Sequence, residues 1–252
     1  MLSLSLSPVG VARGGLAVVV LATLAACGPS MSQGSVAGAS LVRTREAERR
    51  SPPPEATARK PAPVMSLASA DWLDRSEREK SDEPDRVVQA LGLKPGDVVA
   101  DVGAGTGYFS LRLARQVGPT GRVIATDVQQ GMLDRLRANA SRANLNNITP
   151  TLTTESDAGL PPGGVDLVLM VDVFHELKAP ALTLTQVRRA LRSDGRLAVV
   201  EYRGEDPALA VGSDHKMTLD QIKREVIPVG FRVDVVHEFL RDQRIVVFKA
   251  AL

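Results

Sequence analysis

The stretch Val98–Tyr108, which reads Val-Val-Ala-Asp-Val-Gly-Ala-Gly-Thr-Gly-Tyr, decides the fold of this chain. A short apolar run with strand character contains an acid, and three glycines at alternate positions follow it. Glycine tolerates positive φ and lets the backbone pass close to a ligand where a Cβ would collide. We therefore expect a strand, a tight ligand-binding loop and then a helix.

The spacing of the glycines narrows the class of ligand. A dinucleotide fingerprint, G-x-G-x-x-G, has its third glycine five positions after the first. Here Gly107 follows Gly103 by four positions, which disfavours an NAD(P)-dependent oxidoreductase but leaves it as an alternative. The stretch instead resembles the first motif of class I S-adenosylmethionine (SAM)-dependent methyltransferases, D-x-G-x-G-x-G.

Strand-like and helix-like segments alternate through the rest of the chain. The apolar run Val165–Val171 is typical of a parallel strand that is buried on both faces. The last two strands are joined by a short polar turn and must be antiparallel. We predict an α/β fold with a Rossmann-like, doubly wound, seven-stranded sheet, mostly parallel with a terminal antiparallel β-hairpin, as the resemblance also implies. The expected strands are Val98–Val102, Arg122–Asp127, Ile148–Leu152, Val165–Val171, Arg196–Tyr202, Phe231–Phe239 and Arg244–Phe248. The expected helices are Asp71–Lys80, Pro84–Leu91, Tyr108–Val117, Gly131–Ala143, Ala181–Leu191 and Thr218–Ile227.

The first 70 residues do not carry such a pattern. Residues 1–27 contain a short apolar run and end in Leu-Ala-Ala-Cys, which resembles the cleavage box of bacterial lipoprotein signal peptides. That resemblance implies acylation of Cys27, the only cysteine, and a lipid-anchored location in the bacterial cell envelope, whereas the cofactor argues for the cytoplasm. Residues 28–70, rich in Ser, Pro and Ala, are expected to form a flexible tether. Residues 71–252 are expected to form the methyltransferase domain.

The charge of the chain bears on its partners. Residues 61–252 carry 24 basic and 26 acidic side chains, and aromatic residues make up 3% of the chain. A nucleic-acid-binding domain is expected to be basic and to offer aromatic side chains for stacking. We therefore predict a small-molecule substrate and no nucleic-acid partner.

The cofactor residues are expected at the carboxyl ends of the strands, where ligands bind in open α/β sheets. The resemblance places Gly103, Gly105 and Gly107 under the methionine part of SAM and Asp101 near its ammonium group. It implies that Asp127 accepts hydrogen bonds from the ribose hydroxyls, although a helix N-cap is the alternative role. The same pattern assigns Val128 and Val171 to the cofactor site. The family's adenine-contacting acid falls on Ser156 here, so Asp157 is chosen in its place.

Three residues are candidates for catalysis. His175 follows the fourth predicted strand and has an unperturbed pKa near neutrality, as a substrate-site base requires. Glu201 lies at the end of the fifth predicted strand, and His215 follows that strand. Both could bind or deprotonate a substrate, or form a surface ion pair or helix cap. No metal site is predicted, because neither a cysteine nor a second nearby histidine joins Asp172, His175 and Glu176.

Together, these features predict an enzyme that binds SAM and methylates a small molecule by in-line transfer, with Asp71–Leu91 closing over the site. A SAM-binding module without catalysis, acting as a sensor, is the alternative from another class. The sequence leaves the oligomeric state and the methyl acceptor open.

Overall fold

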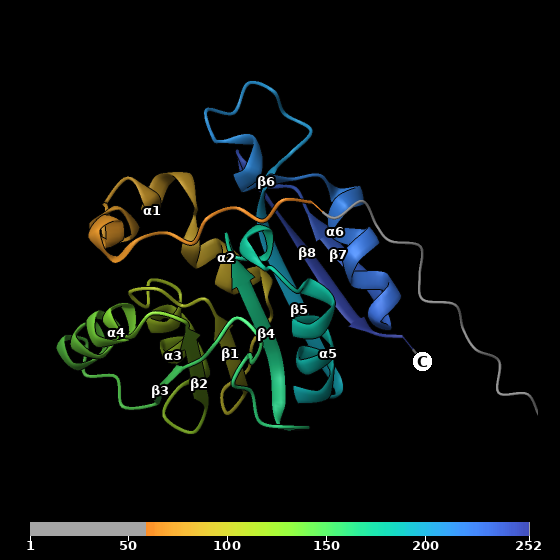
Figure 1. The fold of residues 1–252 in the computed structure, drawn as a ribbon. Helices are drawn as coiled ribbons and strands as arrows, with labels where there is room; N and C mark the ends of the chain where they lie inside the picture. The colour runs from red at the N-terminus through yellow and green to blue at the C-terminus, as the bar shows by residue number, and fades with distance from the viewer. Residues whose placement is uncertain (1–58, 252) are drawn as a thin grey trace, which may run out of the picture. The chain divides into compact units, whose positions relative to one another are not determined.

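The structure is a computed structural model that describes residues 59–251. Its centre is one sheet with the strand order β3-β2-β1-β4-β5-β8-β7, and a short strand, β6, pairs with the end of β5 (Figure 1). The first five strands are parallel, whereas β8 is antiparallel to both β5 and β7. The predicted fold class is confirmed, with two-residue β6 added to the seven strands. The strands are β1 Val98–Val102, β2 Arg122–Asp127, β3 Ile148–Leu152, β4 Val165–Val171, β5 Leu191–Arg203, β6 Lys216–Met217, β7 Phe231–His237 and β8 Gln243–Ala250.

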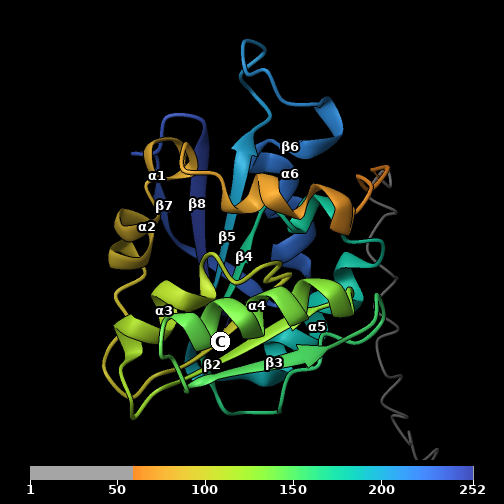
Figure 2. The same ribbon diagram turned by 90° about the vertical axis from the view of Figure 1, so that its left-hand side faces the viewer.

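Helices cover both faces of this sheet, and Figure 2 shows α3 and α4 in front of it. The α-helices are α1 Arg78–Ser81, α2 Pro84–Ala90, α3 Ser110–Val117, α4 Gln130–Arg142, α5 Pro180–Ala190 and α6 Leu219–Val226. The short 3-10 helices are η1 Leu67–Asp74, η2 Phe174–Glu176, η3 Ser213–His215 and η4 Ile227–Val229.

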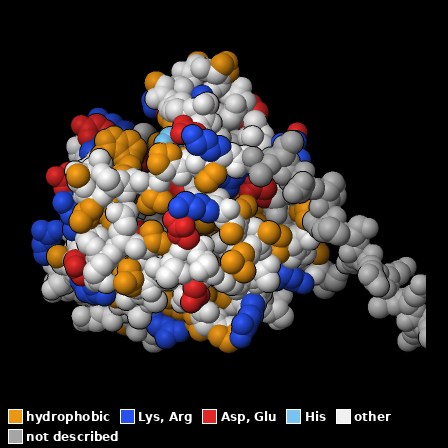
Figure 3. Space-filling view, in the orientation of Figure 1, with side chains coloured by type: hydrophobic (Ala, Val, Ile, Leu, Met, Phe, Trp, Pro, Cys, Tyr) orange, Lys and Arg blue, Asp and Glu red, His pale blue; other side chains and the backbone are white. Residues whose placement is uncertain are grey.

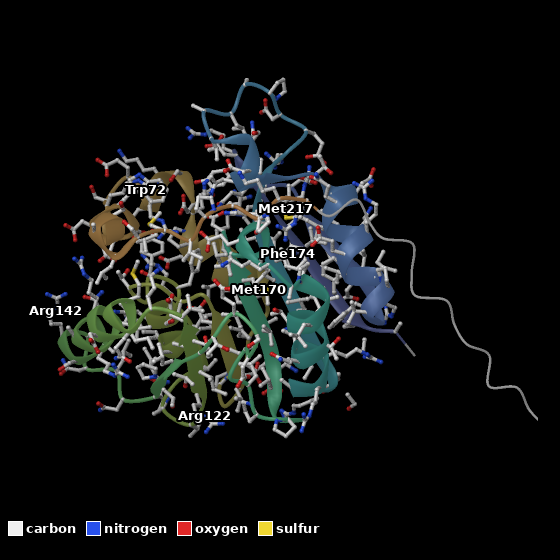
Figure 4. All side chains as sticks on the ribbon, in the orientation of Figure 1. Trp72, Arg122, Arg142, Met170, Phe174 and Met217 are labelled. Carbon is white, nitrogen blue, oxygen red and sulfur yellow. The ribbon has the colours of Figure 1, made fainter. Side chains whose placement is uncertain are left out.

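Two hydrophobic cores lie on opposite faces of the sheet. Successive side chains of a strand point to opposite faces, so β4 sends Leu167 and Leu169 into the core under α2, α3 and α4. Its Val168 and Met170 enter the other core, under α5 and α6. Figure 4 labels Met170 and Phe174, which both belong to this second core. Burial on both faces explains why β4 is a nearly continuous apolar run.

The helix predicted over Asp71–Lys80 is broken in the structure. The 3-10 helix η1 ends at Asp74, Arg75 is extended, and α1 begins only at Arg78. The arginine side chains satisfy carbonyl groups at the break, because Arg75 donates to the carbonyl oxygen of Trp72 and Arg78 to that of Leu73. These side-chain contacts replace helical hydrogen bonds that a continuous helix would have made.

The folded part also begins earlier than the predicted boundary at residue 71, which falls inside η1. In Figure 1 the segment that starts at residue 59 runs across the carboxyl ends of the strands. Ala62 N–H donates to the carbonyl oxygen of His175 (3.1 Å), and the side chain of Gln129 donates to the carbonyl oxygen of Met65 (2.8 Å). Residues 59–70 therefore belong to the fold rather than to a tether.

The predicted leader, Cys27 and the tether up to residue 58 lie outside the described residues. Within residues 59–251, no helix combines the length and the apolar character that crossing a membrane requires.

Candidate active site

A cavity of about 420 Å³ opens at the carboxyl ends of β1, β2 and β4. The strand order puts β1 between β2 and β4, so the loops after these strands meet there. The space-filling view shows a small area of histidine surface beside hydrophobic surface, at the base of the loop that projects above the strands (Figure 3). The cavity has an apolar side and a side rich in titratable groups, and the predicted site residues divide between them.

The glycine loop adopts the conformation that its sequence predicts. Gly103, Gly105 and Gly107 have φ values of +73°, +54° and +89°, which side chains rarely tolerate. Gly103 and Gly105 line the cavity, but Gly107 does not. A Cβ at Gly107 would lie 2.8 Å from Cγ of Leu136 in α4, so this glycine allows the loop to pack on α4. The structure therefore gives Gly107 a packing role, and its cofactor contact stays a prediction.

Asp127 joins two of the loops that form the cavity. Its Oδ2 accepts the backbone N–H of Gly105 (2.9 Å), and its Oδ1 accepts that of Gln129 (2.8 Å). Burial raises the pKa of Asp127, and these backbone hydrogen bonds oppose the rise. Because α4 is capped by Gln129, Asp127 is not its N-cap residue. A carboxylate can accept about four hydrogen bonds, so this one retains acceptor capacity in a cavity that it lines.

Asp101 is the most deeply buried acid of the predicted cofactor site. Its carboxylate is 3% exposed and accepts a hydrogen bond from the Ser110 hydroxyl (2.6 Å). Burial raises its pKa to about 6, and the negative charge of Asp127 adds to the rise. A positively charged ligand beside Asp101 would favour the ionised carboxylate.

Two valines give the cavity part of its apolar wall. Val128 follows Asp127 and is 40% exposed, which is high for a valine beside a buried strand end. Val171 ends β4 on the other side of β1. Both line the cavity, where the sequence places them.

Asp157, predicted to contact the adenine, does not line the cavity. Its side chain is exposed and accepts the backbone N–H of Gly159 (2.9 Å), which turns it back on its own loop. Thr153, Thr154 and Glu155 line the cavity from this segment instead, and Glu155 pairs with Lys178 (2.6 Å). The Asx-type turn at Asp157 explains the difference, because a short acid two residues before a glycine binds its own backbone.

The three predicted catalytic residues are brought together from three elements. Glu201 in β5 is fully buried, and its Oε2 lies 2.6 Å from Nδ1 of His175 in η2. The other ring nitrogen of His175, Nε2, lies 3.1 Å from Nδ1 of His215 in η3. Burial lowers the pKa of His175, but the hydrogen bond and charge of Glu201 raise it by more, so the net shift is upward. His175 and His215 line the cavity, whereas Glu201 lies behind His175.

Two acids that the sequence analysis considered only as metal ligands lie beside this cluster. Asp172 has φ +54°, and its Oδ1 accepts a hydrogen bond from Gln243 (2.7 Å). Burial, followed by the charge of Glu201, raises its pKa to about 7. Burial likewise raises the pKa of Glu176 to about 7. The statement that no second histidine lies near these acids is wrong, because His215 is 40 residues away in sequence but in contact with His175.

The N-terminal segment lines the cavity with residues from the first part of the predicted Asp71–Leu91 and with residues that precede it. Met65, Trp72, Leu73 and Arg78 line it. The Thr106 hydroxyl donates to Asp74 (2.6 Å), which fastens η1 to the glycine loop. Trp72, labelled in Figure 4, lies above α4.

A glycine loop after β1 and an acid at the end of β2, sharing one cavity in a sheet of this order, define the class I SAM-dependent methyltransferases. The chain belongs to the methyltransferase domain family, which matches residues 93–228. The matched region is thus a methyltransferase domain, and Gly103, Gly105, Asp101 and Asp127 fit a SAM cofactor by position and chemistry.

Curated relatives include quinone-modifying enzymes. The chain is 30% identical over 132 residues to the ubiquinone/menaquinone biosynthesis C-methyltransferase UbiE of Hydrogenovibrio crunogenus, covering 50% of this chain and 51% of that protein. It is 33% identical over 110 residues to the demethylmenaquinone methyltransferase of Symbiobacterium thermophilum, covering 43% of this chain and 44% of that protein. The chain thus spans about half the length of the curated relatives that it matches.

Among solved structures, a SAM-dependent methyltransferase from Aquifex aeolicus is similar over most of the fold. The two chains align with a TM-score of 0.69 and 27% identity, covering 73% of this chain and 98% of the other.

Replacing Asp127 by Asn should weaken binding of S-adenosylhomocysteine at least tenfold, because hydrogen bonds to a charged acceptor contribute about 1.5–3 kcal/mol. Asp157→Asn is the matched control and should leave the affinity unchanged, since its side chain lies outside the cavity. Isothermal titration calorimetry on the whole chain measures both affinities, and thermal melts verify folding. Equal affinities for Asp127→Asn and wild type, or an equal loss in Asp157→Asn, would contradict the placement.

Replacing Asp101 by Asn should stabilise the free protein at pH 7.5 while weakening cofactor binding. The folded-state pKa of Asp101, about 6, exceeds the ordinary aspartate value of 3.8, so the protein loses stability as pH rises between about 4 and 6. Asp101→Asn removes that loss, which amounts to up to about 3 kcal/mol. Urea denaturation at pH 5 and pH 7.5 should show a gap between variant and wild type that widens with pH. A difference in stability between variant and wild type that does not change with pH would refute the raised pKa of Asp101.

Proposed function

We propose that this protein transfers the methyl group of SAM to a small organic molecule that binds beside His175 and His215. The observation that carries the proposal is that one cavity joins the cofactor residues to a cluster of titratable side chains. Gly105 and Asp127 line one part of that cavity, and His175, His215 and Asp172 line another.

The enclosure of the cavity favours a small acceptor. Met65, Trp72 and Leu73 from the N-terminal segment form part of its wall, so a macromolecule would have to displace them. The relatives named as quinone C-methyltransferases, together with a nocamycin O-methyltransferase of Saccharothrix syringae (30% identical over 117 residues, 45% of this chain and 41% of that protein), support the same size class. Because only about half of those proteins is matched, their acceptors are a guide to chemistry and size alone.

The residues of this chain have separable tasks in the reaction. SAM, when bound, supplies a methyl group on a positively charged sulfur. Asp127 would hold the ribose hydroxyls and Asp101 would face the ammonium group, which fixes the direction of the donor. Enclosure by the N-terminal segment limits water, and orientation in such a site can lower a barrier by roughly 7–11 kcal/mol.

The catalytic roles of His175, Glu201 and His215 stay predictions. The arrangement gives the three residues different kinds of role. His175 and His215 face the cavity and can contact an acceptor directly. Glu201 accepts a hydrogen bond from His175 and is buried, so it would act through His175 as a positioning residue. An acceptor with an acidic O–H or C–H group is the chemistry that this arrangement suits.

The alternative is a SAM-binding module without catalysis. The lipoprotein-like leader gives it weight, because SAM is a cytosolic metabolite and an exported enzyme would need a supply. An assay on the purified chain tests the chemistry independently of where the protein resides.

Incubation of the whole chain with methyl-labelled SAM, a panel of phenols and reduced quinones, and a bacterial small-molecule extract should give a labelled organic product. His215→Ala should lower the rate about 100-fold, because acid–base groups contribute roughly 10²–10⁴, and should keep wild-type affinity for S-adenosylhomocysteine. His237→Ala, in β7 and outside the cavity lining, is the control and should keep the wild-type rate. Tight cofactor binding with no transfer to any acceptor would favour the sensor.

A further inference from the structure

We propose that His175, His215 and Glu176 form a binding site for one divalent transition-metal ion at the acceptor side of the cavity. One ligand atom from each of these three side chains lies within 4.8 Å of the other two. All three residues line the cavity, so an ion held there would be accessible to a small molecule.

The spacing of the two imidazoles matches that of a pair of metal ligands. Nε2 of His175 and Nδ1 of His215 are 3.1 Å apart. Zinc–nitrogen bonds are about 2.0–2.1 Å long, so two nitrogens on one ion at angles of roughly 90–110° lie about 2.8–3.4 Å apart. The two side chains could therefore bind one ion with little movement of the backbone.

A second, independent observation is the buried carboxylate behind His175. Glu201 is 0% exposed, and its two oxygens are taken up by Nδ1 and the backbone N–H of His175 (2.6 and 3.2 Å). In the neutral ring whose Nδ1–H donates to Glu201, Nε2 carries no proton and presents a lone pair toward His215. Histidines that bind metals almost always donate their other ring N–H to such a partner, which fixes the ring and raises its basicity.

The backbone that carries these ligands is held from several sides. Arg59 donates to the carbonyl oxygens of Phe174 and His175, both at 2.6 Å, and also pairs with Glu225 (2.8 Å). His215 immediately precedes β6, which is paired with the end of β5. A site on such restrained segments keeps its geometry without an ion, as a binding site needs.

The donor set selects the class of ion. Two imidazoles and one carboxylate suit Zn²⁺, Fe²⁺, Co²⁺ or Mn²⁺, whereas Mg²⁺ and Ca²⁺ prefer sites made of oxygen ligands alone. Three protein ligands leave at least one coordination position open, as in catalytic metal sites. We assign that position to an oxygen of the methyl acceptor; this assignment, unlike metal binding itself, rests on the proposed function. The competing arrangement is a direct hydrogen bond between the two histidines with no ion.

Titration of the whole, untagged chain with Co²⁺, followed by visible absorption and then by competition with Zn²⁺, tests the site. We expect one ion per chain. His215 and Glu176 are both partly buried. The variants His215→Ala and Glu176→Gln should each weaken Co²⁺ binding at least tenfold. Glu201→Gln keeps all three ligands and should weaken binding roughly 10- to 100-fold and alter the Co²⁺ spectrum. His237→Ala removes the third histidine of the chain and should change neither the affinity for Co²⁺ nor the Co²⁺ spectrum.

Wild-type binding of Co²⁺ and Zn²⁺ no tighter than that of His215→Ala would overturn the proposal. So would loss of binding in His237→Ala with retention in His215→Ala. Affinity for S-adenosylhomocysteine, measured on the same samples, separates the two proposals. Intact cofactor binding without metal binding removes the metal site alone, whereas metal binding without cofactor binding or methyl transfer removes the proposed function alone.

Discussion

The Asp127 carboxylate holds together the two loops on which the cofactor side of the cavity depends. It accepts one backbone N–H from the glycine loop after β1 and another from the segment that leads into α4. Both donors belong to turns that have few other ways to satisfy a buried amide. A shorter or neutral side chain at position 127 would leave at least one of them without its acceptor. The residue that binds the ligand in this class is thus also the residue that shapes its loop.

Three acids that line the cavity favour positively charged ligands. Asp101, Asp172 and Glu176 all have pKa values raised by burial, to between about 6 and 7. A cationic ligand offsets the free-energy cost of ionising such groups, whereas an anionic ligand increases it. Both a sulfonium cofactor and a divalent metal ion satisfy that requirement. The electrostatics therefore favour the same ligands as the geometry does.

The sequence was sufficient for the regular parts of the fold and for half of the site. Strands β1 to β4 begin and end at the predicted residues. Apolar runs buried on both faces explain this for β1, β2 and β4. The exposed edge strand β3 does not have such a run. Asp127 and Val128 were found because a strand end determines where they lie. Asp157 and Gly107 do not line the cavity for local reasons that spacing does not reveal, a side-chain turn in one case and contact with α4 in the other. The contact between His175 and His215 joins residues 40 positions apart, and only the register of β6 against β5 brings them together.

A crystal structure of the whole chain with S-adenosylhomocysteine tests the central claim most directly. The account predicts both ribose hydroxyls within hydrogen-bond distance of the Asp127 carboxylate, with Val128 against the adenine ring and the glycine loop beneath the homocysteine moiety. A nucleoside bound elsewhere, or an Asp127 that contacts only the backbone amides of Gly105 and Gln129 while the ligand is present, would contradict it.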